Sequence, residues 1–356
     1  MNRTELKILD HFIVDTSNCK IIPFGNGHIN NTYKVENNKG NIWLLQKINI
    51  SVFKDPECLI KNHLELNNCY DSQREIDIPK LINENSNQFL FGNEKIGHWR
   101  LLNFFKDTTS IENVTNIEQA EEAGSAFGSF IKGSANCNIK NFKEVIPDFH
   151  NLTSRYQQFE KALQLDKVTR KPKIKELIQF FESFYRELQT LENEISNQRI
   201  PIRIVHNDTK INNLLFRNNS AVAVIDLDTV GPGNILYDYG DALRTLANET
   251  DEDQQDLSQV KFSLKWFSAF TKSYLIKVSD IISESEKKWL WQAPFLMTYI
   301  MGIRFLTDYL NGDIYYKIKY EEQNLVRAKV QRKLLEDMFK KKENIVQTIT
   351  TYLHNL

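Results

Sequence analysis

The segment spanning residues 204–241 limits the possible folds of this chain more than any other part of the sequence. It contains two short apolar runs, Asn213–Phe216 and Ala221–Ile225, on either side of the polar turn Arg217–Ser220. Two such runs around a polar turn are typical of a β-hairpin. Because a hairpin brings its outer ends together, we expect the residues that flank it to meet at one edge.

Three polar residues flank this predicted hairpin, namely Asp208 and Asn213 at its start and Asp226 at its end. An Asp-x-Asp such as Asp226-x-Asp228 is by itself more often a turn or a cap than a metal site. Together, Asn213 and Asp226 offer the hard oxygen ligands that Mg²⁺ takes when it bridges nucleotide phosphates. We therefore predict phosphoryl transfer in which Asp208 orients a substrate hydroxyl and accepts its proton.

The composition is that of an ordinary globular protein with room for two lobes. Its 356 residues include 45 basic and 46 acidic side chains, and no basic stripe predicts a nucleic-acid or membrane-surface partner. The N-terminus lacks the apolar segment of a signal peptide, and the longest apolar stretch, near 293–303, is too short to span a bilayer. We therefore expect a cytoplasmic protein.

The four cysteines stand far apart and show no Cys-x-x-Cys spacing. This pattern predicts neither a metal site nor a disulfide framework. We expect reduced side chains that mostly pack in the core, at Cys19, Cys58, Cys69 and Cys137.

The first hundred residues are predicted to form a small antiparallel sheet, because short apolar runs alternate with turns. The expected strands lie at 19–24, 31–37, 41–48, 78–83, 88–91 and 98–105. A short helix is expected over 4–12 and another over 56–70, where a proline stands at the helix start.

The loop between the first two strands is a candidate nucleotide loop. Gly25, Asn26 and Gly27 would let backbone N–H groups approach a phosphate closely, although glycines between strands usually only make the turn. His28 follows at the loop tip, where it would either hydrogen-bond a polyol substrate or be an exposed turn residue.

Lys47, in the third strand, is the candidate partner of the nucleotide α- and β-phosphates. A shift of one residue in the register would place Gln46 on that face instead. Glu57 and Glu65 are both possible partners of Lys47. Phe104 ends the sheet at the predicted linker, where backbone groups commonly contact adenine.

From about residue 107 the apolar period becomes helical. The helices are expected from a capping box at Thr115-x-x-Glu118 onward, and then at 174–195, 253–278, 284–310 and 321–353. The predicted fold class is α+β, with an N-terminal lobe over 1–105 and a catalytic lobe over 106–356. A ligand is expected in the cleft between the two lobes.

Two further polar residues stand in apolar helical segments. Asp238 would either accept hydrogen bonds from the backbone of the catalytic loop or cap a helix. Arg304 would either form a surface ion pair with Asp308, four residues later, or face a polar pocket.

Several segments together resemble the N-acetylhexosamine 1-kinases of the aminoglycoside phosphotransferase and choline kinase-like family. These segments are GNGHINNTYKV, LLQKIN, VHNDTKINNLLF, VIDLDTVGPG, YDYGDALR and IRFLTDYLNGDIYYK. The resemblance covers residues from about 20 to about 320. It implies a protein-kinase-like fold, with a β-rich N-terminal lobe and a mostly helical C-terminal lobe. It also implies ATP- and Mg²⁺-dependent phosphorylation of the anomeric hydroxyl of N-acetylglucosamine or N-acetylgalactosamine.

The resemblance also implies roles for individual residues. Asp208 matches the catalytic base, Asn213 and Asp226 the metal ligands, Gly25 and Gly27 the phosphate loop, and His28 and Arg304 the sugar contacts. Asp228 is a further candidate to assist the metal. The acceptor remains open between a hexosamine and an aminoglycoside, choline or homoserine, and an inactive nucleotide-binding module is the alternative from another class. The sequence leaves open ATP or GTP as donor, and monomer or dimer.

Overall fold

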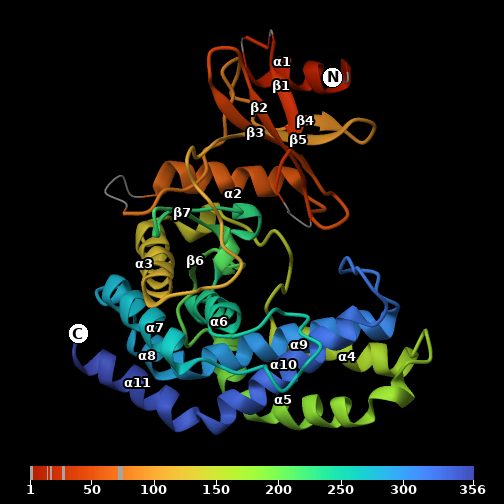
Figure 1. Ribbon diagram of the computed structural model, residues 1–356, viewed down its shortest axis with the longest axis vertical. Coiled ribbons are helices and arrows are strands. Elements are labelled where there is room, and N and C mark those ends of the chain that lie inside the picture. Colours follow the sequence, from red (N-terminus) through yellow and green to blue (C-terminus); the bar gives the residue numbers. More distant parts are fainter. Residues whose placement is uncertain (1–2, 14, 17, 26–28, 71–74) are drawn as a thin grey trace.

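A five-stranded antiparallel sheet forms the N-terminal end of the molecule (Figure 1). The computed structural model describes residues 3–13, 15–16, 18–25, 29–70 and 75–356. The strands are β1 (Lys20–Pro23), β2 (Asn31–Glu36), β3 (Ile42–Ile48), β4 (Phe91–Asn93) and β5 (Gly97–Asn103), in the spatial order β1-β2-β3-β5-β4. The predicted antiparallel sheet is confirmed, but residues 78–83 form no strand and contribute only a bridge between Leu81 and Leu102.

The two faces of this sheet pack against different helices, because successive side chains of a strand point to opposite faces. The residues buried on the side of α1 (Arg3–Phe12) are Val35, Trp43, Leu45, Trp99 and Leu101. Those packed on the side of α2 (Pro56–Cys69) are Leu44, Ile48 and Leu102. Odd-numbered residues of β3 therefore face α1, and even-numbered residues face α2.

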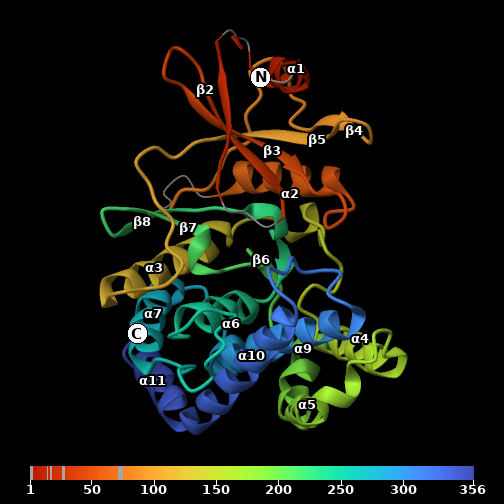
Figure 2. The ribbon, with the colours of Figure 1, turned by 45° about the vertical axis from the view of Figure 1, so that its right-hand side comes forward.

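Helix α2 lies between the sheet and the rest of the molecule (Figure 2). It begins at the predicted proline, and the Asp55 side chain caps it by accepting a hydrogen bond from the backbone N–H of Cys58 at 2.9 Å. The face of α2 that points away from solvent carries Asn62 and His63, both fully buried. Asn62 donates to backbone carbonyls of the C-terminal part, at Lys143 and Val230, whereas His63 donates to the carbonyl of Pro79 within the N-terminal part.

The C-terminal part is mainly helical (Figure 1). Its helices are α3 (Ile117–Ser134), α4 (Leu152–Leu165), α5 (Lys175–Ser196), α6 (Ile235–Leu246), α7 (Leu264–Val278), α8 (Glu284–Trp289), α9 (Ala293–Asn311), α10 (Gln323–Lys340) and α11 (Lys342–His354). The predicted helix over 253–278 is wrong in its first part, because α7 begins only at residue 264. Among the described residues, no helix is long and apolar enough to cross a membrane.

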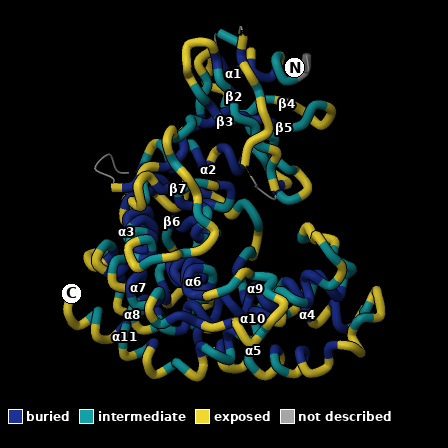
Figure 3. The backbone as a smooth tube through the Cα atoms, viewed as in Figure 1, coloured by how far each residue is buried: buried dark blue, intermediate teal, exposed yellow. Residues whose placement is uncertain are grey.

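Helix α3 packs along α7 at one side of this part, and much of the α3 tube is buried (Figure 3). The contact is close at Gly124, where a Cβ atom would lie 2.2 Å from the carbonyl oxygen of Phe270. The helix begins one residue later than the predicted capping box. Asn116 accepts from the N–H of Gln119 at 2.9 Å, and the Gln119 side chain accepts in turn from the N–H of Thr115 at 2.8 Å.

A disulfide joins Cys69, at the end of α2, to Cys137, just after α3. The prediction of four reduced cysteines is therefore wrong for this pair, whereas Cys19 and Cys58 are free and buried. The two bonded residues are 68 positions apart in sequence. They meet only because the ends of two helices from different parts of the fold come together, which residue spacing does not reveal.

The predicted hairpin is confirmed as β7 (Leu214–Arg217) and β8 (Ser220–Val224), which pair antiparallel. Its two turn residues, Asn218 and Asn219, have φ angles of 50° and 68°, and asparagine tolerates this left-handed conformation well. A second pair consists of β6 (Arg203–Val205) and β9 (Gly231–Gly233). Both pairs lie between α2 and the C-terminal helices (Figure 2).

Candidate active site

Asn213, at the start of the hairpin, forms hydrogen bonds both with Asp208 and with the residue just before Asp226. The Asn213 amide nitrogen donates to the backbone oxygen of Asp208 at 2.8 Å and to its carboxylate at 3.2 Å. The backbone oxygen of Asn213 accepts from the N–H of Ile225, immediately before Asp226, at 2.9 Å. The ends of the hairpin therefore meet, as the sequence predicts.

Two buried side chains hold the loop that carries Asp208. The carboxylate of Asp238, on α6, accepts from the N–H groups of His206 and Asn207, both at 2.7 Å. This confirms that Asp238 supports the catalytic loop, while the cap of α6 is Asn234. His206 donates from Nε2 to the carbonyl of Ile225 at 2.8 Å, so it links this loop to the end of β8.

Asp226 occupies an uncommon backbone conformation, with φ 62° and ψ 58°. A residue other than glycine adopts this left-handed region only where its surroundings enforce it, and such residues often lie at functional sites. The Asp226 side chain is exposed to solvent, but the protein packed around it and repulsion from Asp228 and Asp208 raise the pKa of its carboxyl to about 8. Below that pH the carboxyl is mostly protonated, and a bound cation, which favours the carboxylate form, would displace its proton.

These residues fit a magnesium ion bound together with a nucleotide. Among the described residues, no cluster of three His, Cys, Asp or Glu side chains could hold a metal by itself. Mg²⁺ does not require one, because it commonly takes one or two protein oxygens and completes its shell with phosphate and water. The Asn213 nitrogen is used by Asp208, which leaves the amide oxygen of Asn213, with Asp226, as the ligand atoms offered to the ion.

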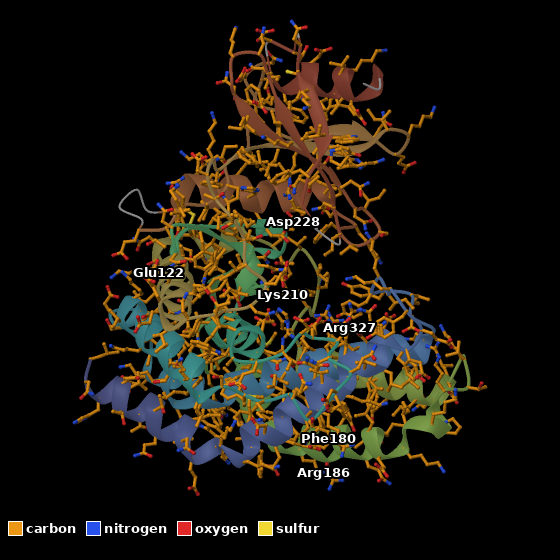
Figure 4. All side chains as sticks on the ribbon, viewed as in Figure 1. Glu122, Phe180, Arg186, Lys210, Asp228 and Arg327 are labelled. Atoms are coloured by element: carbon orange, nitrogen blue, oxygen red, sulfur yellow. A yellow bond between two sulfur atoms is a disulfide. The ribbon has the colours of Figure 1, made fainter. Side chains whose placement is uncertain are left out.

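Lys210, labelled in Figure 4, follows Asp208 by two residues and is influenced by several acidic groups. The Asp208 carboxylate is the largest influence that raises the pKa of Lys210, and Glu252 and Asp241 act in the same direction. The ammonium is therefore charged in the neutral range, next to the candidate base. Sequence reasoning missed this residue, although its position in the His-x-Asp-x-Lys segment was visible.

The structure does not bring Lys47 to this group. Lys47 is an odd-numbered residue of β3, and its ammonium lies over the ring of Trp99, with 5.7 Å between the nitrogen and the ring centroid. The rings on that face pack against α1, away from α2 and the hairpin. This geometry does not support Lys47 as the phosphate ligand, and within the described ranges neither Glu57 nor Glu65 forms an ion pair with it.

Of the other residues predicted to bind the nucleotide, the two that the structure describes, Gly25 and Phe104, lie near each other at one end of the sheet. Asn26, Gly27 and His28 fall outside the described residues. Gly25 has a φ of 78°, with open space around its α-carbon. Phe104 follows β5 and contacts Phe24, next to Gly25, with 5.5 Å between the ring centroids.

Arg304, on α9, lies among aromatic rings and not in a surface ion pair. Its guanidinium carbon is 4.7 Å from the centre of the Phe149 ring and about 6 Å from those of Tyr315 and Tyr316. Its side chain donates a hydrogen bond to the Met301 sulfur at 3.3 Å. Asp308 instead accepts from the backbone N–H groups of residues 314–316.

Two buried histidines predict a measurable pH dependence of stability. Burial lowers the pKa of His63 to about 4 and that of His150 to about 3. Each ring donates from Nε2 to a backbone carbonyl, His63 to Pro79 and His150 to Asn207. A histidine whose pKa is lower in the folded than in the unfolded state contributes its full stabilisation when the pH is above the unfolded-state pKa of about 6.5. That contribution is lost as the pH falls toward the folded-state pKa.

We expect His150→Gln to reduce the acid sensitivity of the free energy of unfolding. Keeping His150 neutral at pH 5 lowers the free energy of unfolding by roughly 2 kcal/mol relative to pH 7. A glutamine does not titrate and so has no such cost. The comparison must be between variants, because the raised pKa values of Asp226 and Asp238 act in the opposite direction. Urea unfolding at both pH values measures the difference, and His354→Asn, near the C-terminal end of α11, is the control. An unchanged pH difference in His150→Gln would show that His150 is not buried as a neutral ring.

A sheet joined to a helical part, with the hairpin and its Asp208–Asn213–Asp226 group between them, defines the bilobal fold of kinases. Residues 20–264, well over half of the chain, match the phosphotransferase enzyme family (APH), and the chain belongs to that family.

Solved structures agree with the predicted fold class, which is confirmed. An aminoglycoside phosphotransferase from Alicyclobacillus acidocaldarius aligns with a TM-score of 0.65 at 12% identity, covering 98% of this chain and 96% of that one. Choline kinase from Cryptosporidium parvum aligns at 0.62 and 14%, covering 98% and 99%. Ethanolamine kinase from Plasmodium vivax aligns at 0.58 and 14%, covering 88% and 82%. At these identities the likeness shows the fold.

Proposed function

We propose that this protein transfers the γ-phosphoryl group of ATP, with Mg²⁺, to the anomeric hydroxyl of an N-acetylhexosamine and releases the sugar 1-phosphate. The observation that carries the proposal is the contact of Asn213 with Asp208 across the base of the hairpin that ends in Asp226. In this proposal residues 1–105 form the nucleotide-binding lobe and residues 106–356 the catalytic and substrate-binding lobe.

The chemistry needs little from the protein beyond positioning and charge compensation. When bound, the metal would neutralise charge on the phosphates. Asp208 orients the sugar hydroxyl toward the phosphorus and accepts its proton late in the transfer. Lys210, close enough to Asp208 for its pKa to be raised, compensates negative charge on the transferring group. His206 and Asp238 keep the loop in place throughout.

A neutral polyhydroxyl acceptor suits the surroundings of Arg304. Aromatic rings such as Phe149 and Tyr315 can cover the apolar face of a sugar, while a guanidinium donates hydrogen bonds to its hydroxyl or acetyl oxygens. Among the described residues, no carboxylate forms a salt bridge with Arg304. One of its donors, Nη1, points to the Met301 sulfur, and a ligand would not have to displace an acidic partner to reach the guanidinium. His28 remains a proposed second sugar contact from the sequence resemblance.

A panel of acceptors with ATP and Mg²⁺, followed by phosphorus NMR, tests this proposal. We expect ADP release with N-acetylglucosamine or N-acetylgalactosamine, and a phosphorus signal coupled to the anomeric proton. Phosphate on another oxygen would contradict the 1-kinase assignment. Nucleotide binding without ADP release for any acceptor would favour the inactive module. Repeating the panel with GTP decides the donor.

One observation favours a cationic acceptor as the second candidate. A cavity of about 310 Å³ beside the catalytic loop is lined by the acidic Glu144 and Asp148 and by the aromatic Phe149, His150 and Tyr237. Acidic and aromatic walls suit an ammonium group. The solved neighbours in fold include proteins named choline kinase and ethanolamine kinase. Choline, ethanolamine and an aminoglycoside therefore belong in the same panel, and turnover with one of them alone would replace the sugar.

We expect Arg304→Ala to raise the sugar KM roughly tenfold or more, because a hydrogen bond from a charged donor contributes about 1.5–3 kcal/mol. The KM for ATP should change less than about twofold, since Arg304 lies among rings of the helical part and not at the sheet. Arg332→Ala is the matched control, because Arg332 also lies over an aromatic ring, that of Phe180 on α5, and not over the rings around Arg304. An unchanged sugar KM in Arg304→Ala would remove this residue from the site.

Location is also open to measurement. A cytoplasmic enzyme would have direct access to ATP, and we propose that location. The Cys69–Cys137 disulfide is of a kind more common in oxidising compartments. Fractionation of cells, followed by detection of the protein, decides between the two.

A further inference from the structure

The N-terminal sheet reaches the candidate metal loop through a buried ion pair. Arg100, on β5, lies on the face of the sheet that looks toward α2, directly opposite Gln46 of β3. Its guanidinium donates to the carboxylate of Asp228, two residues after Asp226. The side chains of Arg100 and Asp228 are only 2% and 4% exposed. Figure 4 shows Asp228 at the boundary between α2 and the hairpin.

The pair is part of a chain of hydrogen bonds that crosses three strands. Arg100 donates from Nε and Nη2 to the Gln46 side-chain oxygen at 2.9 and 2.7 Å, and Gln46 donates to the Thr32 hydroxyl at 3.0 Å. The second oxygen of Asp228 accepts from the Asn30 amide, which lies between the nucleotide loop and β2. Both Asp228 oxygens therefore accept from the N-terminal part, one from Arg100 of β5 and the other from Asn30 just before β2.

This arrangement changes the role expected for Asp228. A carboxylate whose two oxygens already accept hydrogen bonds from Arg100 and Asn30 is held by the sheet and is not an open metal ligand. Asp226, in contrast, is exposed and lacks a basic partner within ion-pair distance among the described residues. Asp228 and Asp226 are joined by one residue, so fixing the first restricts where the second can lie.

A second buried contact acts on the same segment from α2. The Asn62 amide donates to the carbonyl of Val230 at 2.9 Å and to that of Lys143 at 2.6 Å, and its oxygen accepts from the N–H of Lys143. Asn62 is 1% exposed. The segment 226–230 is thus held at Asp228 by the sheet and at Val230 by α2.

We propose that the Arg100–Asp228 pair, and not Lys47, is the connection through which the N-terminal sheet positions Asp226 for a metal–nucleotide complex. In this inference, which rests on the proposed phosphotransfer function, Arg100 and Asp228 are positioning residues. Lys47 cannot serve, because it lies on the opposite face of the same sheet, over Trp99.

The test is the affinity for Mn²⁺, a spectroscopic substitute for Mg²⁺, in the presence of ADP, followed by electron paramagnetic resonance. Arg100→Gln and Asp228→Asn should each weaken Mn²⁺ binding about tenfold or more, as loss of residues that orient a metal ligand commonly does. The double variant should bind Mn²⁺ no more weakly than the more affected of the two single variants, because both substitutions break the same ion pair. Arg100→Lys should recover part of the affinity.

Arg203→Gln is the matched control for stability. Arg203 makes a two-bond contact with the fully buried Glu286 at 2.6 and 2.9 Å, between the start of β6 and α8. This variant should lose thermal stability but keep its Mn²⁺ affinity within about twofold. Unchanged Mn²⁺ binding in folded Arg100→Gln would overturn the inference. Loss in Asp228→Asn without loss in Arg100→Gln would make Asp228 a metal ligand and would overturn it as well.

A second measurement separates this inference from the proposed function. Amide hydrogen exchange of residues 225–230, measured without nucleotide, should be faster in Arg100→Gln than in the unchanged protein or in Arg203→Gln. If the protein binds no nucleotide but this exchange difference appears, the phosphotransfer proposal fails, and what stands is that Arg100 and Asp228 restrain the segment around Asp226. If exchange in 225–230 does not change, the positioning role is refuted whatever the enzyme does.

Discussion

Replacement of Asp208 by asparagine is expected to lower kcat by roughly three orders of magnitude, within the range found for loss of a general base, and to leave nucleotide affinity nearly unchanged. The reason is that the loop is held by its backbone. Asp238 accepts from the N–H groups of His206 and Asn207, and Asn213 donates to the backbone oxygen of residue 208 at 2.8 Å. The Asp208 carboxylate also accepts from the Asn213 nitrogen at 3.2 Å, and the amide oxygen of an asparagine can accept the same bond, so the substituted side chain should occupy the same place without accepting a proton.

The measurements are kcat from ADP release and the Kd for ATP with Mg²⁺ from calorimetry. Asp256→Asn, at a fully exposed position, is the control for the chemical change itself. A parallel loss of ATP affinity and melting temperature in Asp208→Asn would mean that the carboxylate supports the loop and does not act on the substrate.

Replacement of Asp226 by asparagine is expected to weaken the binding of ATP with Mg²⁺ by roughly two to three orders of magnitude, because a direct carboxylate ligand contributes several kcal/mol. Without Mg²⁺, the affinity for ATP should be the same in both proteins. Asparagine tolerates the left-handed backbone at this position, so the loop should keep its shape.

The same substitution should raise the melting temperature of the protein without ligand. Desolvation and the neighbouring carboxylates raise the pKa of Asp226 to about 8. A carboxyl with a raised pKa destabilises the fold once the pH exceeds its unfolded value of about 3.8, and this cost grows up to the folded value. A neutral asparagine has no such cost. Lower stability together with unchanged ATP binding would show that Asp226 is a structural residue.

These two results would distinguish the roles that the hairpin combines. Asp208 would affect the rate and not the binding of nucleotide, whereas Asp226 would affect binding only when the metal is present. Only the Asp226 variant would also gain stability. A structural explanation for both residues predicts instead that rate, binding and stability fall together.

The hairpin and its flanking residues could be predicted because they depend on short-range patterns. Residues 213–225 contain both strands and the turn, so the meeting of Asp208, Asn213 and Asp226 required only that this ribbon fold back on itself. The long helices could be predicted for the same reason, since a repeat of three to four residues defines the apolar face of a helix such as α5. Asp238 was predicted as a support because it follows the hairpin closely.

The errors occurred where one residue of register or a distant contact decides the outcome. Lys47 and Gln46 are neighbours on β3, and only the packing of α1 on one face and α2 on the other determines which of them faces the hairpin. Side chains alternate between the two faces of a strand, but the sequence of the strand itself does not show which face will pack against α1 and which against α2. Arg100 was overlooked for the same reason, as a charged residue in an apolar strand whose partner lies 128 residues away.

The sequence by itself determined the local elements and the chemistry of the group around Asp208, because side-chain periodicity and turn residues act over a few positions. The tertiary structure decided which face of the sheet meets the metal loop, that Asp228 is paired with Arg100, and that Cys69 is bonded to Cys137. These contacts join segments that are far apart in the chain. They depend on how whole elements pack, and no short pattern of residues encodes that packing.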